Sequence, residues 1–316
     1  MKTVKQPNLL SYLGRFTGVY IIVYALIALL FLNFQSLLPE SKSLALDLYK
    51  PFRLFHVEAI IGQLLRAIAF ALVFYPFYDI IFRSKTRARI ILFISMWGIA
   101  LICSVEPQPG SIEGIIYTTI SFVEHASVII ATGLQMLIFI FIFTNWELIK
   151  NEENDSGSFL KLFPDSYKIK GYTIRFVFIH IITYWVVGSI FYEIAGYQDA
   201  LESMEVFELW RPLENLSAVL LVFFGQIVRG TLIALLLYPF YQKYIKKKWG
   251  WVYLFWLLAG LTILGSPLFL TEFISFEGSF VDFFRSLIIG IPEIFSQIFV
   301  FSIAFFFWQK RIEKRR

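Results

Sequence analysis

The sequence has 316 residues, of which 58% are hydrophobic and only 16% are charged, and its mean hydropathy is +0.70. Soluble domains carry about 25% charged residues, so this composition excludes an ordinary soluble domain and predicts an all-α integral membrane protein. The net charge of +5 comes from short basic runs beside apolar segments. That arrangement excludes a nucleic-acid partner and predicts contact with membrane lipid.

Eight apolar segments predict about eight transmembrane helices, because most of them are long enough to cross roughly 30 Å of hydrocarbon. In chain order they are 16–39, 59–78, 90–105, 126–146, 176–192, 215–241, 249–271 and 288–308. Three of the segments contain a charged residue within the apolar run, namely Arg66, Arg229 and Glu293.

Lysine and arginine gather before the first segment, between the second and third, between the sixth and seventh, and after the eighth. The intervening loops are acidic, as the run from Asp199 to Glu214 illustrates. Because basic residues are retained on the cytoplasmic side of short loops, this pattern predicts that both termini are cytoplasmic. Short loops and the lack of a targeting segment favour the inner membrane of a bacterial cell as the location.

An internal repeat links the second and sixth segments. Residues 62–78 and 225–241 match at nine of seventeen positions, within a shared Gly-Gln-x-x-Arg start and a shared Tyr-Pro-Phe-Tyr end. The pattern predicts a four-helix repeat over 1–150, a cytoplasmic linker over 151–170 and a second four-helix repeat over 171–316. An even number of helices per repeat predicts similar orientation and a pseudo-twofold axis along the membrane normal. The first and fifth segments resemble each other poorly, so we expect the duplication to have drifted there.

Arg66 and Arg229 are the strongest candidates for a binding role. A cation at this depth is costly in lipid by a few kcal/mol or more, so each arginine must face the bundle interior or a hydrated cavity. Gln63 and Gln226 lie one helical turn earlier on the same face. This face offers the donors that a carboxylate, a phosphate or a lipid headgroup requires. The alternative is that each arginine pairs with an acid such as Glu293, Glu58 or Glu124 and only holds helices together.

Four further polar residues recur in both halves and complete the candidate ligand-binding set. They are Glu113, Glu277, Gln135 and Gln297. A solvated helix start explains the two glutamates, and hydrogen bonding between helices explains the two glutamines. Each Tyr-Pro-Phe-Tyr motif is expected to anchor its helix at the lipid interface and to bend it.

No catalytic motif, metal-ligand spacing or cofactor-binding pattern is present, so no catalytic residue, metal site or cofactor is predicted. The leading functional hypothesis is a transporter, permease or lipid-handling conduit with a site for an anionic small molecule or lipid headgroup between the repeats. One alternative is a membrane assembly or sensory subunit. Another is an intramembrane enzyme acting on lipid or peptide, with Glu124, His125, Glu113 or Glu277 as acid–base groups. The sequence leaves the oligomeric state open.

Overall fold

The computed structural model describes residues 5–37, 57–148, 166–195, 197, 210–211, 216–266 and 290–315. Within these residues the fold is all helical, apart from one isolated bridge between Thr118 and Trp210. The helices are α1 (Leu9–Ser36), α2 (Val57–Phe74), η3 (Tyr75–Phe77), α3 (Tyr78–Ile81), α4 (Lys85–Phe93), η4 (Ile94–Ile102), α5 (Ile112–Tyr117), α6 (Phe122–Glu147), α7 (Ser166–Ile194), α9 (Leu216–Leu237), η7 (Tyr238–Phe240), α10 (Tyr241–Ile245), α11 (Gly250–Thr262) and α14 (Ile291–Lys314). Helix α7 begins inside the range predicted as the linker.

Six helical stretches in the described part of the chain are long and apolar enough to cross a membrane, which supports a multi-pass membrane protein. They cover Leu9–Phe31, Ala59–Ile81, Phe122–Glu147, Lys168–Ile194, Leu216–Ile245 and Ile291–Lys314. The third and seventh predicted segments fall on shorter helices. In the third, α4 passes into the π-helix η4, and in the seventh, α11 has 13 residues. The structure therefore supports six of the eight predicted spans.

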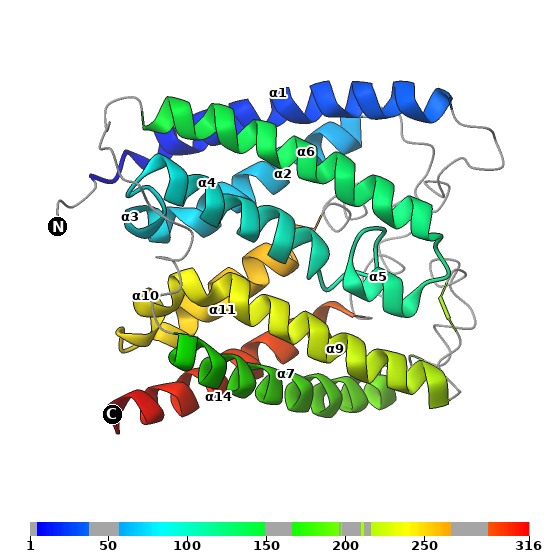
Figure 1. Cartoon of the computed structure of the whole chain (residues 1–316), viewed down its shortest axis with the longest axis vertical. Coiled ribbons are helices and arrows are strands. Elements are labelled where there is room, and N and C mark those ends of the chain that lie inside the picture. The colour runs from blue at the N-terminus through cyan, green and yellow to red at the C-terminus, as the bar shows by residue number, and fades with distance from the viewer. Residues whose placement is uncertain are drawn as a thin grey trace.

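The chain is arranged in two groups of helices that lie one above the other in Figure 1. Helices α1 to α6 form the upper group, and helices α7 to α14 form the lower group. Both chain ends lie at the left of this view near α3 and α10, and α5 lies toward the opposite end. The basic segments that end α10 and α14 are thus gathered at one end of the molecule.

Each group contains an aromatic cluster between its first and last long helix. In the first, Tyr12 and Phe16 of α1 pack against Phe139 and Phe143 of α6, and the last two rings are stacked at 7°. The corresponding cluster in the second group consists of Tyr172, Phe176, Phe301 and Phe305, with the last two stacked at 5°. The buried faces of α1 and α7 therefore carry matching rings, at Phe16 and Phe176 where the first and fifth predicted segments begin, and at Tyr12 and Tyr172 just before them.

Polar contacts at the end of the molecule that carries the termini repeat in the same way. Arg15 Nε donates to Glu147 Oε2 at 2.8 Å, and the Tyr78 hydroxyl donates to Glu147 Oε1 at 2.8 Å. In the second group the matching residues are Arg175, Gln309 and Tyr241, joined at 2.7 Å by Arg175 Nε to Gln309 Oε1 and by Gln309 Nε2 to the Tyr241 hydroxyl. Glu147 in the first group and Gln309 in the second group thus each bind an arginine and a tyrosine.

The two Tyr-Pro-Phe-Tyr motifs interrupt their helices as the short 3₁₀ turns η3 and η7, because proline removes a backbone donor. The Phe77 and Phe240 rings of these motifs are fully buried and contact each other edge to face at 5.3 Å. This contact joins the two groups.

Candidate functional site

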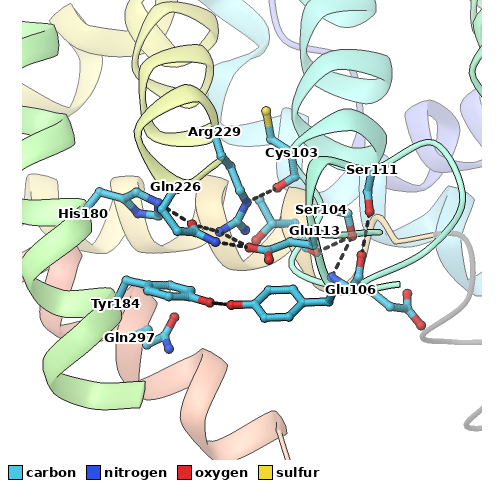
Figure 2. A network of polar contacts seen from close by, with 12 residues as sticks. Cys103, Ser104, Glu106, Ser111, Glu113, His180, Tyr184, Gln226, Arg229 and Gln297 are labelled. Atoms are coloured by element: carbon cyan, nitrogen blue, oxygen red, sulfur yellow. Dashed lines mark hydrogen bonds and ion pairs between the residues drawn. The ribbon is translucent and has the colours of Figure 1, made fainter. Parts of the chain in front are cut away.

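Arg229 binds a carboxylate inside the protein. Its Nη1 atom lies 2.8 Å from Glu113 Oε1, and Gln226 Nε2 donates to the same oxygen at 3.0 Å (Figure 2). The side chains of Arg229 and Glu113 are each 5% exposed. The expectation that Glu113 sits at a solvated helix start is therefore wrong, and the acid that pairs with Arg229 is Glu113 rather than Glu293, Glu58 or Glu124.

Helix α5 carries Glu113 into this position. Ser111 caps α5 by accepting a hydrogen bond from the Gly114 N–H at 2.8 Å. A Cβ atom at Gly114 would overlap the carbonyl oxygen of Gln108, and one at Gly225 would overlap the Ile116 side chain. Gly225 is thus needed for the close approach of α5 to α9, and Gly114 is needed for the packing of α5 against the loop that precedes it.

The surroundings of Glu113 are polar, and the residue is buried. Burial raises the pKa of the Glu113 carboxyl, whereas the Arg229 guanidinium and the Gln226 amide act in the opposite direction. On the far side of Gln226, the His180 Nε2 atom lies 3.2 Å from Gln226 Oε1. The hydroxyls of Tyr117 and Tyr184 contact each other, and Figure 2 shows Tyr184 beside this group.

Both arginines also reach across to the other group of helices. Arg229 Nε donates to the carbonyl of Cys103, directly after η4, at 3.2 Å, and Arg66 Nε donates to the carbonyl of Gly265, shortly after α11, at 2.8 Å. A cation at a helix C-terminus stabilises the exposed carbonyls there. Arg229 of α9 therefore lies at the end of η4, and Arg66 of α2 lies near the end of α11, so that each arginine connects the two groups of helices.

Arg66 differs from Arg229 in having no acidic partner among the described residues. It is 3% exposed, and its guanidinium carbon lies 5.3 Å from the centre of the Phe70 ring. The Tyr20 hydroxyl donates to Gln63 Oε1 at 3.3 Å and lies beside both Arg66 and Gln135. The residues Tyr20, Gln63, Arg66 and Gln135 are called the first cluster below, and His180, Gln226, Arg229 and Gln297 with Glu113 are called the second cluster.

The two glutamines at matching positions of the repeats also differ in their partners. Gln297 Nε2 donates to Glu293 Oε1 at 2.8 Å, and the Tyr197 hydroxyl contacts the other oxygen of Glu293. Gln135 is 5% exposed, and its Nε2 atom has no hydrogen-bond partner in the described part of the chain. Among the described residues, neither the Arg66 guanidinium nor this amide therefore contacts an acid, unlike its counterpart in the second cluster.

The structure thus brings together most of the predicted site residues in two separate clusters. Glu277, the counterpart of Glu113, lies outside the described residues. Sequence reasoning missed Tyr20 and His180. The signal was available, because Tyr12, Phe16 and Tyr20 follow the same four-residue spacing as Tyr172, Phe176 and His180.

In comparisons with known proteins, no family model, no curated protein and no solved structure matches the chain. Two surface grooves in the described residues are lined by no residue of either cluster. One is lined by Ile169, Lys170, Thr173, Ile174 and Leu235, and the other by Val23, Leu26, Ile27, Leu29, Leu30 and Ile138.

Proposed function

We propose that the chain is a transporter, permease or lipid-handling conduit made of two four-helix repeats, with a site for an anionic group at Arg66 between the repeats. The eight-helix arrangement is supported by the places of α4–η4 and α11, which follow the matching turns η3 and η7 in the chain. It is also supported by the recurrence of the aromatic cluster and of the arginine contacts in both groups of helices. We propose cytoplasmic termini for both ends.

One observation carries the functional proposal. The same Gly-Gln-x-x-Arg face occurs twice, and one copy holds a carboxylate between its arginine and its glutamine at 2.8 and 3.0 Å. The other copy, Gln63 and Arg66, has no carboxylate among the described residues. Glu113 therefore serves as an internal example of what this face binds.

The physical need for an anion at Arg66 is large. A guanidinium stays protonated at any relevant pH, and a buried charge is costly unless it is paired. The hydrogen bond from Arg66 to the Gly265 carbonyl offsets only part of the free-energy cost of burying this charge, because a carbonyl carries no net charge. A carboxylate, a phosphate or the headgroup of an anionic lipid would supply the missing charge.

The test compares the two arginines in the full-length protein, reconstituted in nanodiscs of neutral lipid. Arg66→Gln and Arg229→Gln are matched substitutions, and the probes are acetate, inorganic phosphate and nanodiscs doped with phosphatidylglycerol. We expect at least one probe to raise the melting temperature of the parent protein. Arg66→Gln should weaken this response about tenfold or more, because a hydrogen bond to a charged group contributes about 1.5–3 kcal/mol.

The control should behave in the opposite way. Arg229→Gln leaves Glu113 buried without its cation, so this variant should melt at a lower temperature but keep the response to the probe. The proposal fails if no probe affects the parent, or if Arg66→Gln responds like the parent. A rise in melting temperature with acetate or phosphate indicates a small-molecule site. A rise with phosphatidylglycerol alone indicates a lipid site.

The second candidate function is a membrane assembly or sensory subunit. It is favoured by the partners of Arg229, because Glu113 and the Cys103 carbonyl bind this side chain within the protein without a ligand. Under this alternative Arg66 also serves only to join helices through the Gly265 carbonyl. It predicts that both arginine variants lose stability to a similar extent and that no anion stabilises the parent.

A further inference from the structure

We infer that the groove between α7 and α9 is a binding site for one anionic phospholipid, separate from the site at Arg66. The groove has a volume of about 390 Å³, and it is lined by Ile169, Lys170, Thr173, Ile174 and Leu235. Pockets that hold small molecules have volumes of roughly 300–1,000 Å³. None of the lining residues belongs to either cluster, so a lipid could bind here whatever the ligand of Arg66 is.

The groove lies where α7 enters the membrane. The apolar stretch of this helix runs from Lys168 to Ile194, so Lys170 is close to its start. Helix α7 begins at the end of the molecule that carries both chain ends (Figure 1). A lysine at such a position holds its ammonium group among the lipid headgroups while its methylene groups cover apolar surface. The groove therefore begins at headgroup depth.

The lining residues follow one another in the same order as the parts of a phospholipid. Because an α-helix rises 1.5 Å per residue, Thr173 lies about 4.5 Å deeper than Lys170, and Ile174 lies about 6 Å deeper. Leu235 adds apolar surface from α9. A phosphate at Lys170 would thus be followed by an ester carbonyl at the depth of Thr173 and by an acyl chain against the apolar residues.

The hydroxyl of Thr173 supports a polar contact inside the groove. Its Oγ1 atom is buried and has no hydrogen-bond partner in the described part of the chain. Thr183 of the same helix instead donates to the Ile179 carbonyl at 2.9 Å, which is a common way for a helical threonine to satisfy its hydroxyl. A buried donor without an acceptor is unfavourable. An ester carbonyl of a bound lipid would accept from Thr173.

The charges at this end of α7 favour an anionic headgroup. Lys170 is exposed. Arg175 points back along the helix, because its Nη1 atom lies 3.2 Å from the place of a Cβ atom on Gly171, the neighbour of Lys170. Two cations therefore lie at nearly the same level of the helix. Basic pockets between membrane helices on the cytoplasmic side bind anionic headgroups.

The first group of helices provides a matched comparison. The alignment of Tyr12 with Tyr172 matches Leu10, Leu13 and Gly14 of α1 to Lys170, Thr173 and Ile174 of α7. The α1 positions thus carry neither a cation nor a hydroxyl. A preference for anionic lipid is therefore expected at α7 and not at the matching face of α1.

The first experiment measures binding of single phospholipids to the full-length protein by native mass spectrometry in mild detergent. The probes are phosphatidylglycerol and phosphatidylcholine with identical acyl chains. We expect the first phosphatidylglycerol to bind about fivefold more tightly than phosphatidylcholine, since one lysine near anionic headgroups contributes about this factor. Lys170→Gln should remove this preference, and the matched control Leu10→Gln should keep it.

The second experiment tests the contact with Thr173. It compares phosphatidylglycerol with its dialkyl ether analogue, which lacks the ester carbonyls. We expect the parent protein to bind the ester about fivefold more tightly, as one added hydrogen bond allows. Thr173→Val keeps the shape of the side chain without the hydroxyl, so it should bind the two lipids equally. Thr183→Val is the control and should keep the difference, because the Thr183 hydroxyl is already bonded within the helix.

The variants also separate this groove from the Arg66 site. Arg66→Gln should keep the preference of the parent for phosphatidylglycerol. If Arg66→Gln loses the preference and Lys170→Gln keeps it, the lipid belongs to the Arg66 site, so the groove is excluded and the proposed function is supported. If the parent binds both phospholipids equally, bulk lipid or another segment of the chain fills the groove. That result would overturn the inference and leave the response of Arg66 to soluble anions unaffected.

Discussion

At the scale of single residues, the two arginines show how one motif serves two environments. Both guanidinium groups are nearly inaccessible to solvent and both donate to a carbonyl at the end of a helix. Only Arg229 has an acid beside it among the described residues. Removing one partner of a buried ion pair leaves the other as an uncompensated charge in a low-dielectric region. Arg229 and Glu113 therefore each depend on the other.

This dependence gives the first prediction. Glu113→Gln and Arg229→Gln should each lower the free energy of unfolding by about 3–5 kcal/mol, because either change leaves an unpaired buried charge. The double variant should lose less than the sum of the two, with a coupling energy of about 2–3 kcal/mol. Reversible unfolding in mixed detergent measures all four proteins.

The exposed pair between Lys243 and Asp79 is the control, although its atoms are only 2.6 Å apart. The side chain of Asp79 is 49% exposed, and an ion pair in water contributes about 1 kcal/mol or less. Asp79→Asn should therefore have a small effect. Additive losses in the Glu113 and Arg229 cycle would contradict the pairing.

At the scale of helices, glycines decide how closely the two groups of helices pack. A Cβ atom at Gly98 of η4 would lie 2.7 Å from Leu236 of α9, and one at Gly260 of α11 would overlap Val73 of α2. The same type of crossing thus occurs twice, once with each group supplying the glycine. Small residues at such crossings let membrane helices approach closely.

The second prediction concerns these crossings. Gly98→Val and Gly260→Val should each lower the free energy of unfolding by about 1–3 kcal/mol through overpacking. The loss should be larger at Gly260, because Val73 is β-branched and stiff. Val73→Ala should recover part of it. The measurement is unfolding in mixed detergent.

Gly14 and Gly18 of α1 provide matched controls, since a Cβ atom at either position meets nothing within 4 Å. Gly14→Val and Gly18→Val should leave the stability nearly unchanged, within about 1 kcal/mol. Equal losses at all four glycines would mean that helix propensity, and not contact between the groups, determines the effect.

The sequence predicted the long helices well because length and hydropathy identify them without any knowledge of packing. It placed a helix start at Glu113 but did not predict that α5 is buried, since a six-residue helix with mixed composition gives no periodic signal. For that reason the pairing of Glu113 with Arg229, which are distant in the chain, was also missed. The matching rings of α1 and α7 were hidden because aromatic residues are common throughout the apolar segments, so four-residue spacing did not stand out.

At the scale of the whole molecule, the path of α4 and η4 determines how many times the chain crosses the membrane. Both termini, α3 and α10 lie at one end, and α5 lies toward the other (Figure 1). In the proposed eight-helix arrangement α4 and η4 together carry the chain across the membrane, although neither is long enough alone. If they do not cross, the start of α6 lies on the cytoplasmic side.

The last prediction tests this by labelling single cysteines in intact cells with a maleimide that cannot cross membranes. The residues to be replaced are Phe122 at the start of α6 and Ile194 at the end of α7, which are 84% and 76% exposed, and the exposed Lys248 after α10. The native Cys103 is fully buried and should not react in the parent. With eight crossings and cytoplasmic termini, Phe122→Cys and Ile194→Cys should label in intact cells, whereas Lys248→Cys should label only after the cells are permeabilised. If Phe122→Cys instead labels only after permeabilisation, α4 and η4 turn back without crossing the membrane. The two clusters would then not be placed symmetrically across the membrane.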